Sequence, residues 1–142
     1  MLVSQILKDK GDLVFTASPD ETMAAAAALL HSRRVGAMVI VGEQDKVVGI
    51  LSERDVVRAM AEAGAGGLTQ RVSQWMTKDV LFATPDELVH VLLGRMTDRR
   101  VRHLPVVRDG RLAGIVSIGD LVKSKIAETE AEAETLKAYI SA

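Results

Sequence analysis

Cysteine is absent from this chain of 142 residues, and aromatic residues are scarce. Without cysteine there is no disulfide, no thiolate nucleophile and no cysteine-ligated metal. The few aromatic residues are too scattered to form a base-stacking platform for single-stranded nucleic acid; they are Phe15, Trp75, Phe82 and Tyr139. The formal net charge is −1, so the sequence also lacks the strongly basic balance of proteins that bind nucleic acid or anionic membranes. We therefore expect neither as a partner.

Long apolar runs are missing as well. The N-terminal stretch MLVSQILKDKGD is interrupted by charge too early for a signal peptide, and no segment approaches the length of a membrane span. These features predict a cytoplasmic protein. Apolar residues nevertheless make up 48% of the chain, which is enough for a packed core in one ordinary domain or two very small ones.

A short phrase occurs twice in the sequence, as GILSERD at residues 49–55 and as GIVSIGD at 114–120. Other stretches match in the same order along the chain. The matched pairs are VSQIL 3–7 with VSQWM 72–76, SPDE 18–21 with TPDE 84–87, and VGAMVIV 35–41 with VRHLPVV 101–107. The sequence therefore predicts an internal duplication.

Both copies predict the same order of elements, β-α-β-β-α. Each begins with a short apolar run, LVF at 13–15 or VLF at 80–82. An N-cap type, a proline and a glutamate then predict a helix start; they are Ser18, Pro19 and Glu21 in the first copy and Thr84, Pro85 and Glu87 in the second. The two helices are expected to end at Arg33 and Arg99. We predict a mixed α/β (α+β) fold in which the copies pack as a pseudo-symmetric pair, because neither can bury its sheet alone.

The repeats also predict the domain boundaries. The first repeat is expected at 1–62, a Gly/Ala-rich linker at 63–71, the second repeat at 72–126 and a helical extension at 127–142. Leu136, Tyr139 and Ile140 give the end of this extension an apolar side. It is compatible with a solvated helix or with a helix that packs on a neighbouring subunit, and the sequence leaves both open.

Within each phrase a serine precedes an aspartate by three residues, Ser52 before Asp55 and Ser117 before Asp120. The simplest interpretation is a helix capping box. The alternative is a binding site, because the phrase joins a strand to a helix N-terminus, whose free amide groups favour a phosphate. An aspartate held there could accept hydrogen bonds from both hydroxyls of a ribose. A glycine three residues before each serine, Gly49 or Gly114, would permit close approach to the backbone.

The doubled unit, with these phrases at its strand-to-helix turns, resembles a tandem pair of cystathionine-β-synthase (CBS) domains, a Bateman module, of the stand-alone bacterial type. The resemblance covers residues 1–125. It implies a homodimeric regulatory module with two clefts between the repeats. The clefts of this family bind AMP, ADP, ATP, NAD(H) or S-adenosylmethionine; we take AMP as the leading ligand here, with NAD(H) and ATP as alternatives.

The resemblance also assigns roles by position. It implies that Asp55 and Asp120 bind ribose. The residues implied to contact ribose or phosphate are Ser52, Ser117, Arg54, Arg102 and His103. The residues implied to line the adenine are Thr16, Ala17, Gly36, Ala37, Met38, Ala83, Thr84, Leu104 and Pro105. Because Arg102 and His103 stand where the first copy has glycine and alanine, the cleft of Asp120 is expected to be the better nucleotide site.

No catalytic or metal residue is predicted, because the sequence has no P-loop, no G-x-G-x-x-G and no H-E-x-x-H. We interpret the chain as an adenine-nucleotide sensor that signals to a separate, unidentified protein. One alternative is a dimeric interaction scaffold that works without a ligand and uses its aspartates only as caps. Another is an enzyme that turns over a nucleotide, which would need a metal or a general base in the cleft; His103 would be the candidate base.

Overall fold

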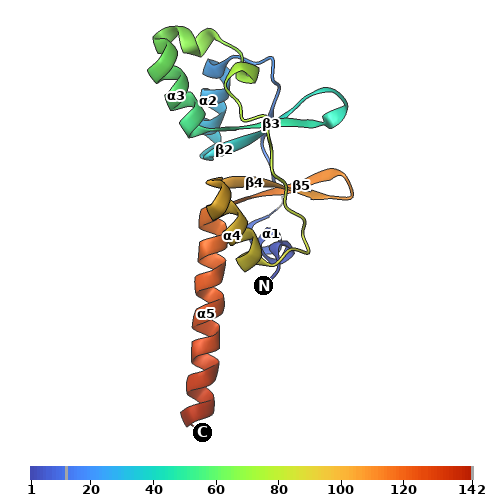
Figure 1. Cartoon of the computed structure of the whole chain (residues 1–142), viewed down its shortest axis with the longest axis vertical. Helices are drawn as coiled ribbons and strands as arrows, with labels where there is room; N and C mark the ends of the chain where they lie inside the picture. The colour runs from blue at the N-terminus through green and yellow to red at the C-terminus, as the bar shows by residue number, and fades with distance from the viewer. Residues whose placement is uncertain (12, 142) are drawn as a thin grey trace. The chain divides into compact units, whose positions relative to one another are not determined.

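The computed structural model describes residues 1–11 and 13–141, and within them it contains five α-helices and two small sheets. This mixed α+β content agrees with the predicted fold class. The chain divides into two compact units, shown in Figure 1. Unit 1 is Met1–Leu13 with Phe82–Ala142, and unit 2 is Val14–Leu81. No helix in the described residues is both long and apolar enough to span a membrane.

Unit 2 is built on a three-stranded sheet. Its main elements are β1 (Thr16–Ala17), α2 (Met23–Arg33), β2 (Ala37–Val41), β3 (Val47–Ser52) and α3 (Glu53–Ala63). The sheet order is β1-β2-β3, with β1 parallel and β3 antiparallel to β2. The sheet and α2 enclose a core that includes Met23, Met38, Ile40 and Leu51, all fully buried.

Unit 1 repeats this plan on a two-stranded sheet. Its elements are α1 (Val3–Lys10), α4 (Val89–Arg99), β4 (His103–Arg108), β5 (Arg111–Ser117) and α5 (Ile118–Ser141). β4 and β5 are antiparallel, and a single parallel bridge from Ala83 to Val106 stands in the place of β1. The predicted helical extension is the continuation of the helix that starts at Ile118; Ala142 lies outside the described residues.

The opening segments of the two copies are exchanged. In unit 1, Val3 N donates to Glu87 O (3.0 Å), so the first opening segment joins the second copy. In unit 2, the equivalent Val72 N donates to Glu21 O (2.8 Å). The compact units therefore differ from the sequence repeats at the N-terminus, where α1 packs with the second copy.

This exchange explains why the predicted helix starts are wrong. α2 begins at Met23 rather than after Ser18, and its cap is Thr22, whose hydroxyl accepts a hydrogen bond from Ala25 N (3.1 Å). α4 likewise begins at Val89. In the first copy the carbonyls of the expected first turn instead accept amides from the opening segment at 72–73, so that turn stays outside the helix. Both helices end where predicted, at Arg33 and Arg99.

The predicted first strands are also displaced. β1 covers Thr16–Ala17 rather than 13–15, and the second copy forms only the bridge at Ala83 rather than a strand at 80–82. A strand of two residues buries very few side chains, so the apolar pattern of the sequence does not mark its position.

The glycine of each repeated phrase makes room for an opening segment. A Cβ atom on Gly49 would lie 2.5 Å from Met76 Sδ and 2.9 Å from Thr77 O. A Cβ atom on Gly114 would lie 2.6 Å from Leu7 Cδ2. Met76 and Leu7 end the matched stretches VSQWM and VSQIL. The group that closely approaches each of these glycines is therefore an opening segment of the protein itself.

Substituting these glycines should destabilise the fold. Gly49→Ala should lower the free energy of unfolding by about 1–3 kcal/mol, because the new methyl group meets the Thr77 carbonyl. Gly114→Ala should cost less, because the Leu7 side chain can rotate away. Urea unfolding of both variants measures the difference.

The matched control is Gly94→Ala in α4, where a Cβ atom has no neighbour within 4 Å. It should raise the free energy of unfolding by about 0.5–1 kcal/mol. A Gly49→Ala protein as stable as the wild type would contradict the packing argument.

Candidate functional site

Asp120 lies in the first turn of α5, and its carboxylate closes the predicted capping box. Asp120 Oδ2 accepts a hydrogen bond from Ser117 N (2.8 Å), and Asp120 N donates to Ser117 Oγ (3.1 Å). The same Oδ2 atom accepts a hydrogen bond from Lys10 Nζ at 2.6 Å. Oδ1 accepts no hydrogen bond from any described residue. Asp120 is therefore a cap that keeps one carboxylate oxygen for another donor.

Lys10 contributes to a lowered pKa of this carboxylate. Lys10 ends α1, where its Nζ also donates to Ile115 O (2.9 Å). Burial raises the pKa of Asp120, but the hydrogen bonds from Lys10 and Ser117 and the charge of Lys10 outweigh it. The pKa of the Asp120 carboxyl consequently lies below its usual value, and the group is ionised at neutral pH.

Asp55 has the equivalent place in unit 2 and different neighbours. Asp55 Oδ2 accepts hydrogen bonds from Ser52 N (2.9 Å) and Ser52 Oγ (3.2 Å). Oδ1 accepts a hydrogen bond from Arg58 Nη2 (3.2 Å), and Asp55 is only 8% exposed. Both carboxylate oxygens are thus occupied.

Arg58 is itself held in place by Trp75. Its Nη2 donates to Trp75 O (2.8 Å), and its guanidinium lies 5.1 Å from the centre of a Trp75 ring. This cation–π contact and hydrogen bond fix Arg58 against Asp55. Both oxygens of Asp55 in unit 2 therefore have donors, whereas among the described residues only Oδ2 of Asp120 in unit 1 has them.

Of the other predicted residues of unit 1, Arg102 and His103 lie beside the turn that carries Asp120. His103 pairs with Ser117 across the β4–β5 hairpin, and Ile118 N donates to Arg102 O (2.8 Å). Arg102 and Thr84 are exposed, and His103 is half-buried. The side chains of the other three predicted residues of unit 1 are buried; they are Ala83, Leu104 and Pro105.

Of the predicted residues of unit 2, Gly36 and Ala37 lie beside the turn that carries Asp55. Ala37 pairs with Ser52 across β2 and β3, and Glu53 N donates to Gly36 O (3.0 Å). Thr16 and Ala17 pair with residues of β2, and Arg54 is exposed on α3. The side chain of Met38 is fully buried in the core of unit 2.

Sequence reasoning missed Lys10 and Arg58, the two cations that contact the aspartates. Arg58 lies three residues after Asp55, on the same helix face, so this spacing was a signal that could have found it. Lys10 lies 110 residues from Asp120, and only the exchange of the opening segments brings the two together. The described residues contain no group of three acidic or histidine side chains able to hold a metal ion.

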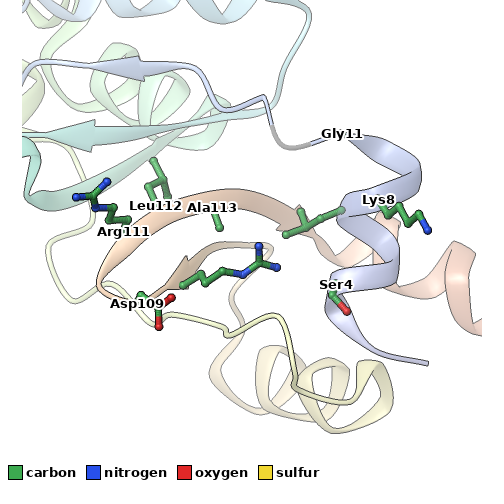
Figure 2. A pocket seen from close by; sticks show the side chains of 9 residues that line it. Ser4, Lys8, Gly11, Asp109, Arg111, Leu112 and Ala113 are labelled. Atoms are coloured by element: carbon green, nitrogen blue, oxygen red, sulfur yellow. The ribbon is translucent and has the colours of Figure 1, made fainter.

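Unit 1 also has an open groove of about 1090 Å³ between α1 and the tip of the β4–β5 hairpin. Figure 2 shows Ser4 and Lys8 on its α1 side and Asp109 and Arg111 at the hairpin. With Arg108, the groove has three cationic side chains against one carboxylate, which favours anions. None of the residues predicted from the sequence to bind a nucleotide lines it.

The doubled β-α-β-β-α unit, with a capped helix after the last strand of each copy, defines a tandem-repeat α+β fold. A family model for the CBS domain matches residues 11–62 and 72–126, and the chain belongs to this family. The solved CBS-domain containing protein ATU1752 from Agrobacterium tumefaciens is 44% identical, with a TM-score of 0.84 over 87% of this chain and 92% of that chain. The mitochondrial CBS domain-containing protein CBSX3 of Arabidopsis thaliana is 34% identical over 97% of this chain and 71% of its own length. The predicted resemblance is confirmed.

Two similar proteins were solved with adenosyl ligands. PAE2072 from Pyrobaculum aerophilum, complexed with AMP, is 26% identical with a TM-score of 0.75, over 84% of this chain and 89% of that chain. The CBS domain pair of MJ0100, in complex with 5'-methylthioadenosine and S-adenosyl-L-methionine, is 28% identical with a TM-score of 0.80. That match covers 90% of this chain and 98% of the other.

The lowered pKa of Asp120 predicts a pH-dependent role for Lys10. A carboxyl with a lower pKa in the folded state stabilises the fold above its unfolded pKa of about 3.9, and the contribution is lost as the pH falls through the folded pKa. Lys10→Met should therefore lower the free energy of unfolding at neutral pH. The loss should be below about 1 kcal/mol because the pair is partly exposed.

Urea unfolding as a function of pH measures this contribution. The difference between wild type and Lys10→Met should shrink as the pH falls below about 4. The matched control is Lys8→Met, which removes a charge from the same helix without touching Asp120. A Lys10→Met loss that is equally large in acid and at neutral pH would show that the ion pair does not cause it.

Proposed function

We propose that this protein is an adenine-nucleotide-binding regulatory module, with AMP as the leading ligand and ATP or NAD(H) as alternatives. The single observation that carries the proposal is the carboxylate of Asp120, whose Oδ1 accepts no hydrogen bond from the described residues while Oδ2 holds Ser117 N and Lys10. Arg102 and His103 lie beside the turn that carries Asp120, and together with Thr84 they would supply the cationic and polar groups that a nucleotide needs. The adenosyl ligands of PAE2072 and MJ0100 support the same class of ligand.

The two copies should bind unequally. In our proposal Asp120 accepts the ribose hydroxyls, while Ser117, Arg102 and His103 contact ribose or phosphate. Asp55 is a weaker candidate, because Ser52 and Arg58 already occupy its oxygens. A ribose could bind Asp55 only by displacing one of these partners, which costs a charge-assisted hydrogen bond. This inequality agrees with the sequence-based preference for the Asp120 half.

The proposed regulatory role needs one property beyond ligand binding. A ligand can act as a signal only if it binds two states of the protein with different affinity. We propose that the protein is a cytoplasmic homodimer that transmits such a change to a separate protein chain.

An interaction scaffold remains the second candidate, because both aspartates are observed as helix caps. In a scaffold these caps would be their whole function. The two functions differ in what a ligand does to stability, and a ligand present at a hundred times its dissociation constant adds about 2.7 kcal/mol.

Thermal unfolding with AMP, ADP, ATP, NAD, NADH and S-adenosylmethionine distinguishes the two. We expect one class of ligand to raise the midpoint by about 5–10 °C. Asp120→Ala should abolish this shift, and the matched variant Asp55→Ala, which also removes a cap, should retain it. If no ligand shifts the midpoint of protein freed of carried-over nucleotide, the scaffold is favoured.

A further inference from the structure

The second half of α5 leaves the body of unit 1. Figure 1 shows α5 extending away from α4 and the hairpin. Leu121 is fully buried, and Glu128 forms an ion pair with the N-terminal amine of Met1 (3.4 Å). Every residue from 129 to 141 is exposed. A single exposed helix of this length gains little stability by itself, so its apolar side chains need an explanation.

These apolar side chains follow a heptad repeat. The exposed positions Val122, Ile126, Thr129, Ala133, Leu136 and Ile140 are separated alternately by four and three residues. Ile126, Ala133 and Ile140 take the a positions, and Val122, Thr129 and Leu136 take the d positions. Four of the six are large hydrophobic residues, exposed by 41% to 74%. This seam is distinct from the side of α5 that faces unit 1 through Leu121 and Glu128.

The charges beside the seam select the partner and its direction. Lys125 and Glu132 occupy g positions, and Glu130 and Lys137 occupy e positions. In a parallel pair of helices, each g residue faces the e residue of the next heptad on the other helix. Two copies of α5 would therefore place Lys125 against Glu130 and Glu132 against Lys137. All of these pairs are attractive.

Antiparallel arrangements of two α5 helices either leave seam residues without a partner or bring like charges together. An antiparallel pair with Lys125 beside Glu132 would place Leu136 opposite Gly119, where α5 has only just begun. Shifting that pair by one heptad would place Glu130 opposite Glu130. Only the parallel, in-register pair matches all six seam positions and all four charged residues.

We propose that α5, along its seam from Val122 to Ile140, forms a parallel, in-register two-stranded coiled coil with α5 of a second copy of this chain. The inference rests on the seam and its charges, and it does not depend on nucleotide binding. It gives the exposed helix a self-complementary interface.

Disulfide cross-linking tests the proposal directly, because the chain has no cysteine of its own. Leu136→Cys introduces a thiol at a d position, where two parallel helices bring equivalent residues within disulfide range. Oxidised glutathione should convert this variant to a covalent dimer at least about tenfold faster than Ala138→Cys, which lies on the opposite side of the helix. Equal rates for the two variants would overturn the proposal.

Charge reversal tests the register. In the Leu136→Cys protein, Glu132→Lys alone or Lys137→Glu alone should slow cross-linking, because each homodimer then opposes like charges. A mixture of the two variants restores both attractive pairs. Mass spectrometry should find the covalent heterodimer well above the random share of about half. A random mixture would show that these charges do not face each other.

Discussion

The close approach of an opening segment to a glycine on the last strand is the constraint on which each unit depends. Leu7 reaches Gly114 in unit 1 and Met76 reaches Gly49 in unit 2, at distances that leave no space for a Cβ atom. Backbone hydrogen bonds then join each opening segment to the turn before the first helix of the other copy. The exchange therefore sets where α2 begins in unit 2, and it brings Lys10 to the carboxylate of Asp120.

The same duplication yields two different carboxylates. Ser52 with Asp55 and Ser117 with Asp120 form equivalent helix caps, so the capping interpretation and the binding interpretation are compatible. Arg58 and Trp75 close the first site within unit 2, whereas Lys10 holds only one oxygen of Asp120. A duplicated fold can in this way give two equivalent carboxylates different hydrogen-bond partners.

Much of this arrangement could be predicted from the sequence. Several stretches match in the same order in both copies, and together they indicate the fold even where each motif alone is weak. The ends of α2 and α4, both caps and the family followed from such patterns. The starts of these helices could not be predicted. Ser18 and Thr84 are residue types that favour an N-cap, but the residues after them bond to an opening segment and stay outside the helix. The contact of Lys10 with Asp120 could not be predicted for a related reason. The two residues are 110 positions apart, and no local spacing connects them.

The most direct test of the central claim, that Asp120 accepts ribose hydroxyls, is a calorimetric titration comparing AMP with its 2',3'-dideoxy analogue. Hydrogen bonds to a charged group contribute about 1.5–3 kcal/mol each. The account predicts that the analogue binds the wild-type protein at least about tenfold more weakly than AMP, and that Asp120→Asn largely removes this difference. Equal affinities for AMP and the analogue in the wild-type protein would contradict it.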